Sequence, residues 1–163
     1  MAFDPTDKLV IVANDAALPV PLLSMINAMS HAVVSRIVLG GTSGLPDATG
    51  GIEQSVWMPS NDGLYTSISQ IGANGPGGVA KIDPTTGTVV HVYNLADFGI
   101  SACVPAGQMK GAGQLPIGYG TAGSWMVLFD PTANGSNGAM VSSFDRIGGS
   151  DEVAFNANDN LYS

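Results

Sequence analysis

The sequence is poor in charged residues, and in basic residues above all. Asp, Glu, Lys and Arg make up 11% of the chain, which is less than half of the ~25% that globular domains usually carry. Five Lys and Arg stand against thirteen Asp and Glu, which gives a net charge of -8. A negative surface repels phosphate groups and anionic lipids. We therefore expect neither nucleic acid nor a membrane as a partner.

Cysteine and long apolar runs are also scarce. Cys103 is the single cysteine of the sequence, which excludes an intrachain disulfide framework and a cysteine-rich zinc site. No apolar run reaches the ~18 residues that a membrane-spanning helix needs, and the first residues lack the basic-then-apolar pattern of a targeting segment. The low Lys and Arg content, with abundant Asn, Ser, Thr and Gly, nevertheless favours an exported protein, extracellular or periplasmic.

No segment keeps the 3.6-residue period of an amphipathic helix, and Pro19, Pro21 and Pro105 stand where a helix would break. The chain is instead rich in turn formers, with 22 Gly and 10 Pro, while 45% of its residues are hydrophobic. That apolar content is sufficient for a core, so the chain is not disordered. Its length of 163 residues corresponds to one domain.

One short pattern recurs about every fifty residues, as in repeat architectures. A few apolar residues are followed by a polar turn, then by leucine and a β-former, so that Leu9 and Leu64 take matching places. The copies are residues 1–10, 56–65 and 153–162, with a degenerate copy at 108–115. The equivalent turn positions are Pro5, Pro59, Gly111 and Ala157.

A second pattern recurs in phase with the first. Residues 82–90 read as strand, Asp-Pro-Thr-Thr-Gly turn and strand, in which Gly87 supplies a position with positive φ. The start of this hairpin repeats at residues 129–132, and residues 26–34 are the same hairpin with His31 in the place of Gly87. We therefore expect strands rather than helices over residues 22–34 and 79–92. Phe129 and Val141 should also lie in strands.

Each period therefore contains four short strands, predicted in the second period at residues 55–58, 64–70, 79–82 and 88–93. Four antiparallel strands per repeat are typical of a β-propeller blade. We expect an all-β chain of three blades over residues 1–163, with repeats at about 1–50, 51–100 and 101–149 and a further blade starting at 150. Trp57, Trp125, Phe129 and Phe155 should pack between blades.

Three blades should not close a ring alone, since propellers usually have ~4–8. Two arrangements remain open. The chain is a fragment of a larger propeller with six or seven blades, or two copies pair. In the paired form, residues 152–155 of one copy would add an inner strand beside residues 9–13 of the other, which would remove open sheet edges.

The repeats resemble those of a known family. The segment Glu-Gln-Ser-Val-Trp from Glu53 to Trp57, followed by Leu-Tyr, is similar to the opening of the gluconolactonase and senescence-marker propellers. The segment that begins at Asp151, Asp-Glu-Val-Ala-Phe-Asn, resembles a second segment of that family. The Asp-Pro-x-x-Gly hairpins and the Gly-Gly-Ser-Asp-Glu-Val phrase at residues 148–153 resemble YVTN-type bacterial surface propellers.

The gluconolactonase resemblance implies a divalent metal in the channel, with Glu53 and Asp151 at ligand positions. Both precede their turn position by the same number of residues, so they should point into the channel at one height. Hard cations such as Ca²⁺ prefer oxygen ligands. The asparagine ligand of the family would fall two positions before Met1, so we expect Glu152 or water to replace it. Calcium is the ion that fits this set best.

The prediction for function is a propeller that binds a ligand, such as a small molecule, in its channel or on its surface. One alternative is a metal-dependent hydrolase of a lactone or similar ester, whose metal would polarise the carbonyl and activate water. Another is a structural half-propeller that assembles as a dimer. We assign no catalytic residue and no cofactor besides the metal. His31, His91 and Cys103 lack the partner patterns of catalytic or zinc sites and are interpreted as structural.

Overall fold

The computed structural model describes residues 1–16, 19–73, 75–99, 105–108, 113–119, 126–145, 153–156, 158–159 and 161–162, with the backbone alone at 105–108 and 119. Over these residues the fold is all-β, and its strands pair in antiparallel fashion. The strands form three four-stranded sheets in chain order and then a two-stranded hairpin. No helix among the described residues is long and apolar enough to span a bilayer.

The first sheet consists of β1 (Ala2–Asp4), β2 (Leu9–Asn14), β3 (Leu22–Asn27) and β4 (Val33–Val38). The second sheet consists of β5 (Ile52–Met58), β6 (Gly63–Ile68), β7 (Gly78–Asp83) and β8 (Thr88–Asn94). The third sheet consists of β9 (Pro105–Gln108), β10 (Leu115–Tyr119), β11 (Met126–Asp130) and β12 (Ala139–Phe144). The C-terminal hairpin consists of β13 (Phe155–Asn156) and β14 (Leu161–Tyr162).

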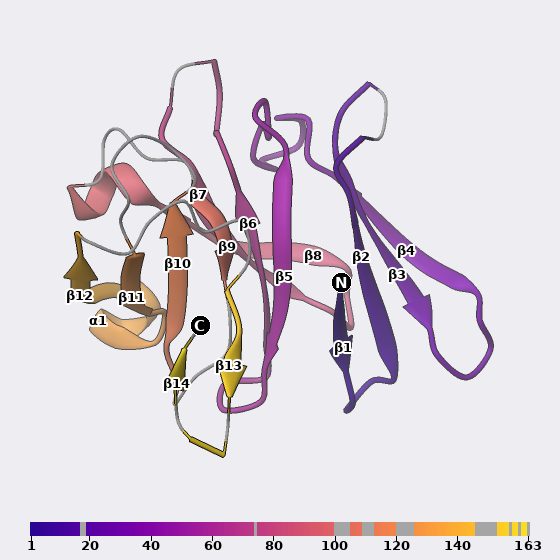
Figure 1. Cartoon of the computed structure of the whole chain (residues 1–163). Coiled ribbons are helices and arrows are strands. Elements are labelled where there is room, and N and C mark those ends of the chain that lie inside the picture. The colour runs from indigo at the N-terminus through magenta and orange to yellow at the C-terminus, as the bar shows by residue number, and fades with distance from the viewer. Residues whose placement is uncertain are drawn as a thin grey trace.

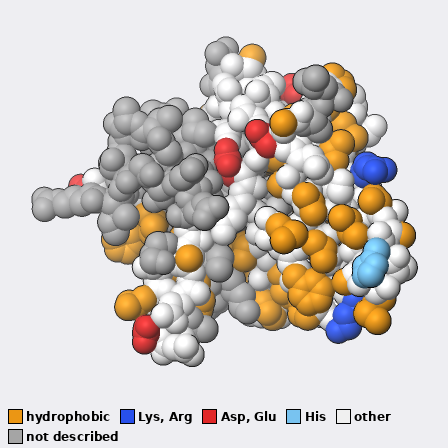
Figure 2. All heavy atoms as spheres, turned by 45° about the vertical axis from the view of Figure 1, so that its right-hand side comes forward, with side chains coloured by type: hydrophobic (Ala, Val, Ile, Leu, Met, Phe, Trp, Pro, Cys, Tyr) orange, Lys and Arg blue, Asp and Glu red, His pale blue; other side chains and the backbone are white. Residues whose placement is uncertain are grey.

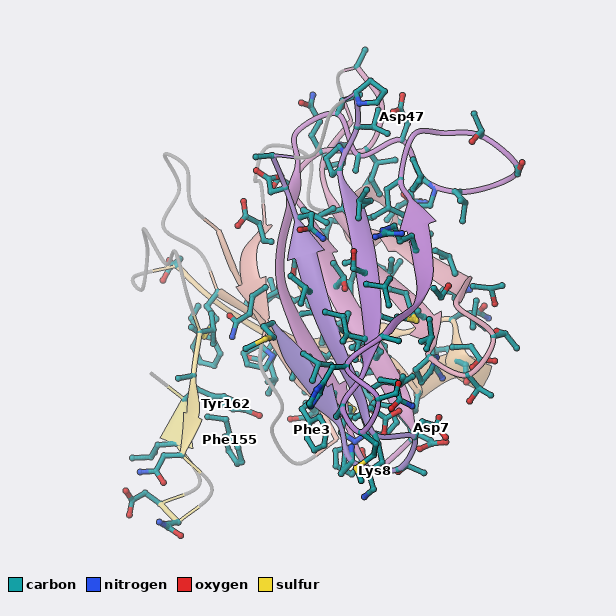
Figure 3. All side chains as sticks on the ribbon, turned by 90° about the vertical axis from the view of Figure 1, so that its right-hand side faces the viewer. Phe3, Asp7, Lys8, Asp47, Phe155 and Tyr162 are labelled. Atoms are coloured by element: carbon teal, nitrogen blue, oxygen red, sulfur yellow. The ribbon has the colours of Figure 1, made fainter. Side chains whose placement is uncertain are left out.

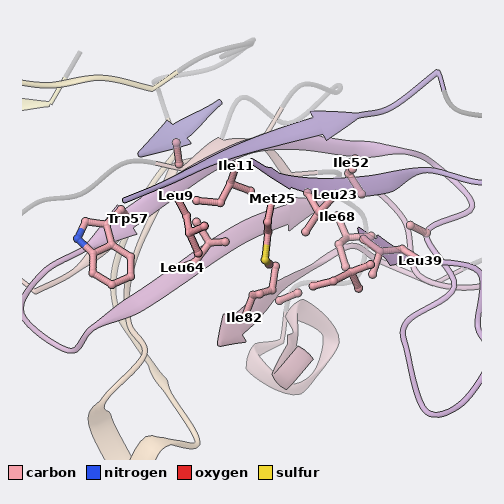
Figure 4. Packing of buried hydrophobic residues seen from close by; sticks show 14 residues of the cluster. Leu9, Ile11, Leu23, Met25, Leu39, Ile52, Trp57, Leu64, Ile68 and Ile82 are labelled. Carbon is pink, nitrogen blue, oxygen red and sulfur yellow. The ribbon is translucent and has the colours of Figure 1, made fainter. Parts of the chain in front are cut away.

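The three sheets are stacked face to face, and the second lies between the other two (Figure 1). Apolar residues of the first and second sheets form one buried cluster, which includes Ile11, Met25 and Ile82 (Figure 4). A second cluster joins the second and third sheets around Tyr65 and Phe129. We call the face of a sheet that points to the preceding sheet its upstream face, and the opposite face its downstream face.

Two hairpin turns confirm the predicted repeat in atomic detail. Gly87 has φ 66° and His31 has φ 58°, so both take the left-handed conformation at matching places. The N–H of Gly87 donates to the carbonyl of Asp83 at 2.9 Å, and that of His31 donates to the carbonyl of Asn27 at 2.8 Å. The side-chain Oδ1 of Asp83 or Asn27 accepts from the second and third N–H groups that follow it.

These turn bonds explain the ionisation of Asp83. Burial acts to raise the pKa of this carboxyl, but the N–H and the hydroxyl of Thr86 and the N–H of Thr85 together outweigh it and hold the pKa below its usual value. Asp-Pro-Thr therefore works as a turn signal through the carboxylate, which satisfies two backbone donors.

The predicted strands are confirmed in the second and third sheets. Ile82 and Val89 lie in strands of the second sheet, and Phe129 and Val141 lie in strands of the third. Residues 22–34 also form two strands and a turn rather than a helix. Two short turns of helix were not predicted. They are the 3-10 turn η1 (Leu95–Phe98) and the single turn α1 (Ala133–Ser136), which joins β11 to β12 and in which Asn134 and Gly135 have positive φ.

The structure corrects the predicted match between Leu9 and Leu64. Lys8 and Asp62 both have positive φ, at 57° and 51°, and both precede the second strand of their sheet. Leu9 therefore corresponds to Gly63, and Leu64 comes one residue later. Since side chains alternate along a strand, Leu9 lies on the downstream face of the first sheet and Leu64 on the upstream face of the second (Figure 4).

The expected pairing of residues 152–155 with residues 9–13 of another copy also needs correction. β1 of the same chain already pairs with this edge, with Ala2 opposite Ile11 and Asp4 opposite Leu9. The backbone donors and acceptors there are already used, so a strand from a second copy cannot pair with that part of the edge.

The close approach of the β7–β8 turn to the first sheet gives a stability prediction. Gly87→Ala would place a Cβ against Ser35 of β4 at a position with φ +66°. A side chain in the left-handed region costs roughly 1–2 kcal/mol, and the contact adds to this cost. We expect the free energy of unfolding in urea to fall by about 2–4 kcal/mol.

Gly44→Ala is the matched control, because Gly44 has φ +78° but no atom within 4 Å of the added Cβ. Its free energy of unfolding should fall only by the cost of placing a side chain in the left-handed region. Equal losses for the two variants would show that the contact between turn and sheet contributes nothing.

Candidate functional site

Three consecutive residues at the start of β5 are held by three different parts of the chain. The N–H of Ile52 donates to Asp15 Oδ1, from the first sheet, at 2.8 Å. Ser69, which follows β6, donates through Oγ to Glu53 Oε1 at 3.1 Å. Gln54 binds residue 153, just ahead of the C-terminal hairpin. We call residues 52–54 the β5 junction.

The contact of Asp15 with the β5 junction depends on a glycine. Gly51 has φ +94°, and a Cβ on it would collide with Asp15 Oδ1. Its carbonyl accepts from the N–H of Ser69 at 3.1 Å, so the entry to β5 is fixed on both sides. The neighbouring Asn14 Nδ2 donates to Ser24 Oγ at 3.1 Å and does not bind the junction.

The Gln54 amide forms a two-point bond with the backbone of Val153. Its Nε2 donates to the Val153 carbonyl, and its Oε1 accepts from the Val153 N–H, both at 3.2 Å. Val153 is 1% exposed, so these bonds satisfy polar groups that water does not reach. A residue 99 positions away along the chain is thereby fixed beside the first strand of the second sheet.

Of the predicted metal ligands, the structure places Glu53 at the β5 junction, whereas Asp151 and Glu152 lie outside the described residues. Among the residues that are described, no group of three or more His, Cys, Asp or Glu side chains is placed to hold a metal ion. Glu53 is partly buried and bonded to Ser69, so its carboxylate is oriented by the protein.

A hollow of about 390 Å³ lies between β1 and β5, close to the β5 junction. It is lined by Met1, Phe3, Gln54, Ser55 and Trp57, among others. The first strands of neighbouring sheets therefore enclose a space that is apolar in large part, with the amide of Gln54 at its border.

The remaining candidates are separated from this region. His31 lies exposed in the β3–β4 turn, and His91 of β8 stacks against the Tyr93 ring with centroids 4.4 Å apart. Cys103 and Trp125 lie outside the described residues.

Sequence reasoning missed Gln54, Ser69 and the bond of Asp15 to Ile52. Gln54 stands next to Glu53 in the motif that carries the family resemblance, but an amide that binds a backbone segment far along the chain leaves no local pattern. Asp15 carried a signal in the Gly50-Gly51 pair, because glycine at a strand can mark a close approach of another group.

No family model matches this sequence, and no curated protein matches it. The fold is similar to the crystal structure of a protein of unknown function from Bacteroides caccae, with a TM-score of 0.56 and 14% sequence identity. The match covers 96% of this chain and 48% of that one, so the chain spans about half the length of that protein. At this identity the likeness shows the fold alone.

The two-point bond of Gln54 gives a local prediction. Gln54→Ala removes both hydrogen bonds to Val153, each worth about 0.5–1.5 kcal/mol. We expect the Val153 amide to exchange with solvent faster, by roughly ten- to a hundredfold, in hydrogen–deuterium exchange with mass spectrometry.

Gln70→Ala is the control, because the Gln70 amide donates to the Ala73 carbonyl in an exposed loop. It should leave exchange at Val153 unchanged. Unchanged exchange in Gln54→Ala as well would contradict a role of the amide in holding the C-terminal segment.

Proposed function

We propose that the chain is half of a β-propeller that binds a ligand in its channel, beside the β5 junction. The observation that carries this proposal is the convergence of Asp15, Ser69 and Val153 on residues 52–54. A rigid polar site where separate sheets meet is the place at which a propeller presents side chains to a ligand. The stacked sheets and the likeness to half of a longer chain support the propeller.

The ligand class that fits the junction is a divalent cation, alone or together with a small molecule. The Glu53 carboxylate is held by Ser69 at 3.1 Å, which orients oxygen ligands for a hard ion. Asp151 and Glu152 immediately precede Val153 in the sequence, and Val153 is bonded to the neighbour of Glu53. We propose that these three carboxylates share one calcium site.

The affinity should be modest. Sites of extracellular proteins often bind Ca²⁺ with dissociation constants of about 10⁻⁴–10⁻³ M, and such a value suits the exported protein that the composition favours. Hydrolysis of a lactone or ester would require this metal, so a test for the metal also decides whether that alternative remains.

Calcium should bind and stabilise the protein. A ligand at about a hundred times its dissociation constant stabilises a folded state by roughly 2.7 kcal/mol. We expect Ca²⁺ to give a calorimetric signal and to raise the melting temperature, and Glu53→Gln to remove both effects.

Asp62→Asn is the matched control. It removes the same charge from the exposed turn at the other end of β5, and asparagine suits its φ of 51°. It should bind calcium as the wild type does. Absence of heat with Ca²⁺, Mg²⁺, Mn²⁺ and Zn²⁺, with unchanged melting, would exclude both the metal site and the metal-dependent hydrolase.

A further inference from the structure

The upstream face of the first sheet is built like a buried face but is exposed. Counted from the turns, Phe3 corresponds to Trp57 and Val33 to Val89 in the second sheet. Trp57 is 7% exposed under the first sheet, whereas Phe3 is 49% exposed. Val89 packs against the buried cluster, while Val33 is 44% exposed.

The pattern continues across the face. Val10 takes the place of Leu64, and Ile26 takes the place of Ile82. Leu64 and Ile82 are both 0% exposed, because the first sheet covers them. The first sheet thus repeats the apolar positions with which the second sheet binds its upstream neighbour. Figure 2 shows hydrophobic side chains gathered over this side of the molecule.

The valines at the β-bulges show which exposed apolar side chains belong to every repeat. Val34, Val90 and Val141 each occupy the bulge of the last hairpin of their sheet. They are 55%, 58% and 49% exposed, whether or not a neighbouring sheet covers that face. Exposure at the bulge is therefore a property of the repeat, and so is that of Val33, because the equivalent Met140 of the covered third sheet is 43% exposed. Exposure at Phe3, whose counterpart Trp57 is buried, reflects an uncovered face.

On the downstream side of the molecule, two apolar residues are also exposed although their counterparts in other sheets are buried. Phe144 of β12 corresponds to Ile37 and Tyr93, which are 3% and 2% exposed beneath the next sheet, yet Phe144 is 43% exposed. Leu161 of the C-terminal hairpin corresponds to Leu9, which is 6% exposed, yet Leu161 is 64% exposed. Figure 3 shows this hairpin, with Phe155 and Tyr162, standing apart from the first sheet and Phe3.

Charged side chains border both surfaces, and the first sheet carries both signs, because Asp7 and Asp15 are exposed there as well as Lys8 and Arg36. Lys8 and Arg36 are exposed at the first sheet, where Figure 2 shows basic side chains beside the apolar area. Asp145 and Asp159 are exposed beside Phe144 and in the hairpin turn.

We propose that two copies of the chain associate head to tail, with the upstream face of the first sheet of one copy against the downstream end of the other, where Phe144 and Leu161 are exposed. This rests on the propeller of the proposed function and names the partner that extends it. A second copy carries the missing downstream surface. Two copies also supply about the length of the similar structure, of which this chain covers 48%. Head-to-tail contacts close into rings when the rotation permits.

Sedimentation velocity of single and mixed variants tests the proposal. The wild type associates at micromolar concentration. Phe3→Glu removes one side of each contact, and the double variant Phe144→Glu/Leu161→Glu removes the other, so each is monomeric alone. An equimolar mixture of the two forms a dimer, because one contact then joins two unmodified surfaces. Complementation of this kind is a property of a head-to-tail contact and not of a symmetric one.

Val34→Glu and Val141→Glu add the same charge at the bulges and leave association unchanged. Far-UV circular dichroism and melting show that each variant is folded, and Phe3→Ser repeats the test with a smaller change. A wild type that stays monomeric at tens of micromolar overturns the proposal. So does association that survives in the double variant, or a mixture that stays monomeric.

Calcium titration of the wild type and of the double variant Phe144→Glu/Leu161→Glu separates this proposal from the proposed function, because Phe3 lines the hollow beside the β5 junction. Calcium heat with a monomeric wild type leaves the channel site in place and removes the second copy. If the variants associate by complementation but calcium gives no heat, the head-to-tail contact stands and the calcium site is excluded.

Discussion

All six residues of β6 are buried, and the rest of the structure depends on that burial. A β-strand directs alternate side chains to opposite faces, so a strand with no exposed residue needs a sheet on each side of it. The second sheet has both, with Leu64 under the first sheet and Tyr65 against the third. Burial raises the pKa of Tyr65 well above its usual value, which marks how little water reaches this layer. Among the described residues the first sheet has a covered downstream face and an exposed Phe3 on its upstream face, and this asymmetry determines where the molecule can still bind.

Stacking also explains the position of the candidate site. Polar bonds between sheets form where backbone groups of one sheet reach the edge of the next, and the first strand of the second sheet lies nearest to such groups. Asp15 comes from the sheet before it and Val153 from the segment after the third sheet, and both bind within residues 52–54. The apolar layers hold the sheets together, while these directional bonds fix where β5 begins. A side chain such as Glu53, placed between two fixed neighbours, is held in the manner that ligand binding requires.

The fold could be predicted from the sequence to the extent that its signals are local. Asp83 to Gly87 and the matching turn at His31 specify their hairpins through nearby side-chain and backbone bonds, and these were predicted correctly. The face to which a residue points is harder to predict, because an error of one residue in the register moves the side chain to the opposite face. Leu9 and Leu64 look equivalent because each is the leucine after its turn, yet they lie on opposite faces. Leu9 follows Pro5 by four residues and Leu64 follows Pro59 by five, and the turn conformation at Lys8 and Asp62 confirms that difference. The bonds of Gln54 and Ser69 escaped prediction because they join positions that no short pattern connects.

Repetition gives the structure an internal standard for its own surfaces. An exposed phenylalanine on a single sheet would carry little meaning, because folded proteins expose much apolar area. Phe3 has a counterpart in Trp57 that shows what the position does when a neighbour is present, and Val34 and Val90 show which exposure belongs to every repeat. The apolar face of each sheet is thus already matched to the face of the next, and the match does not depend on whether the two sheets belong to one chain. A repeat that binds its neighbour within the molecule has, for the same physical reason, the surface to bind an identical neighbour outside it.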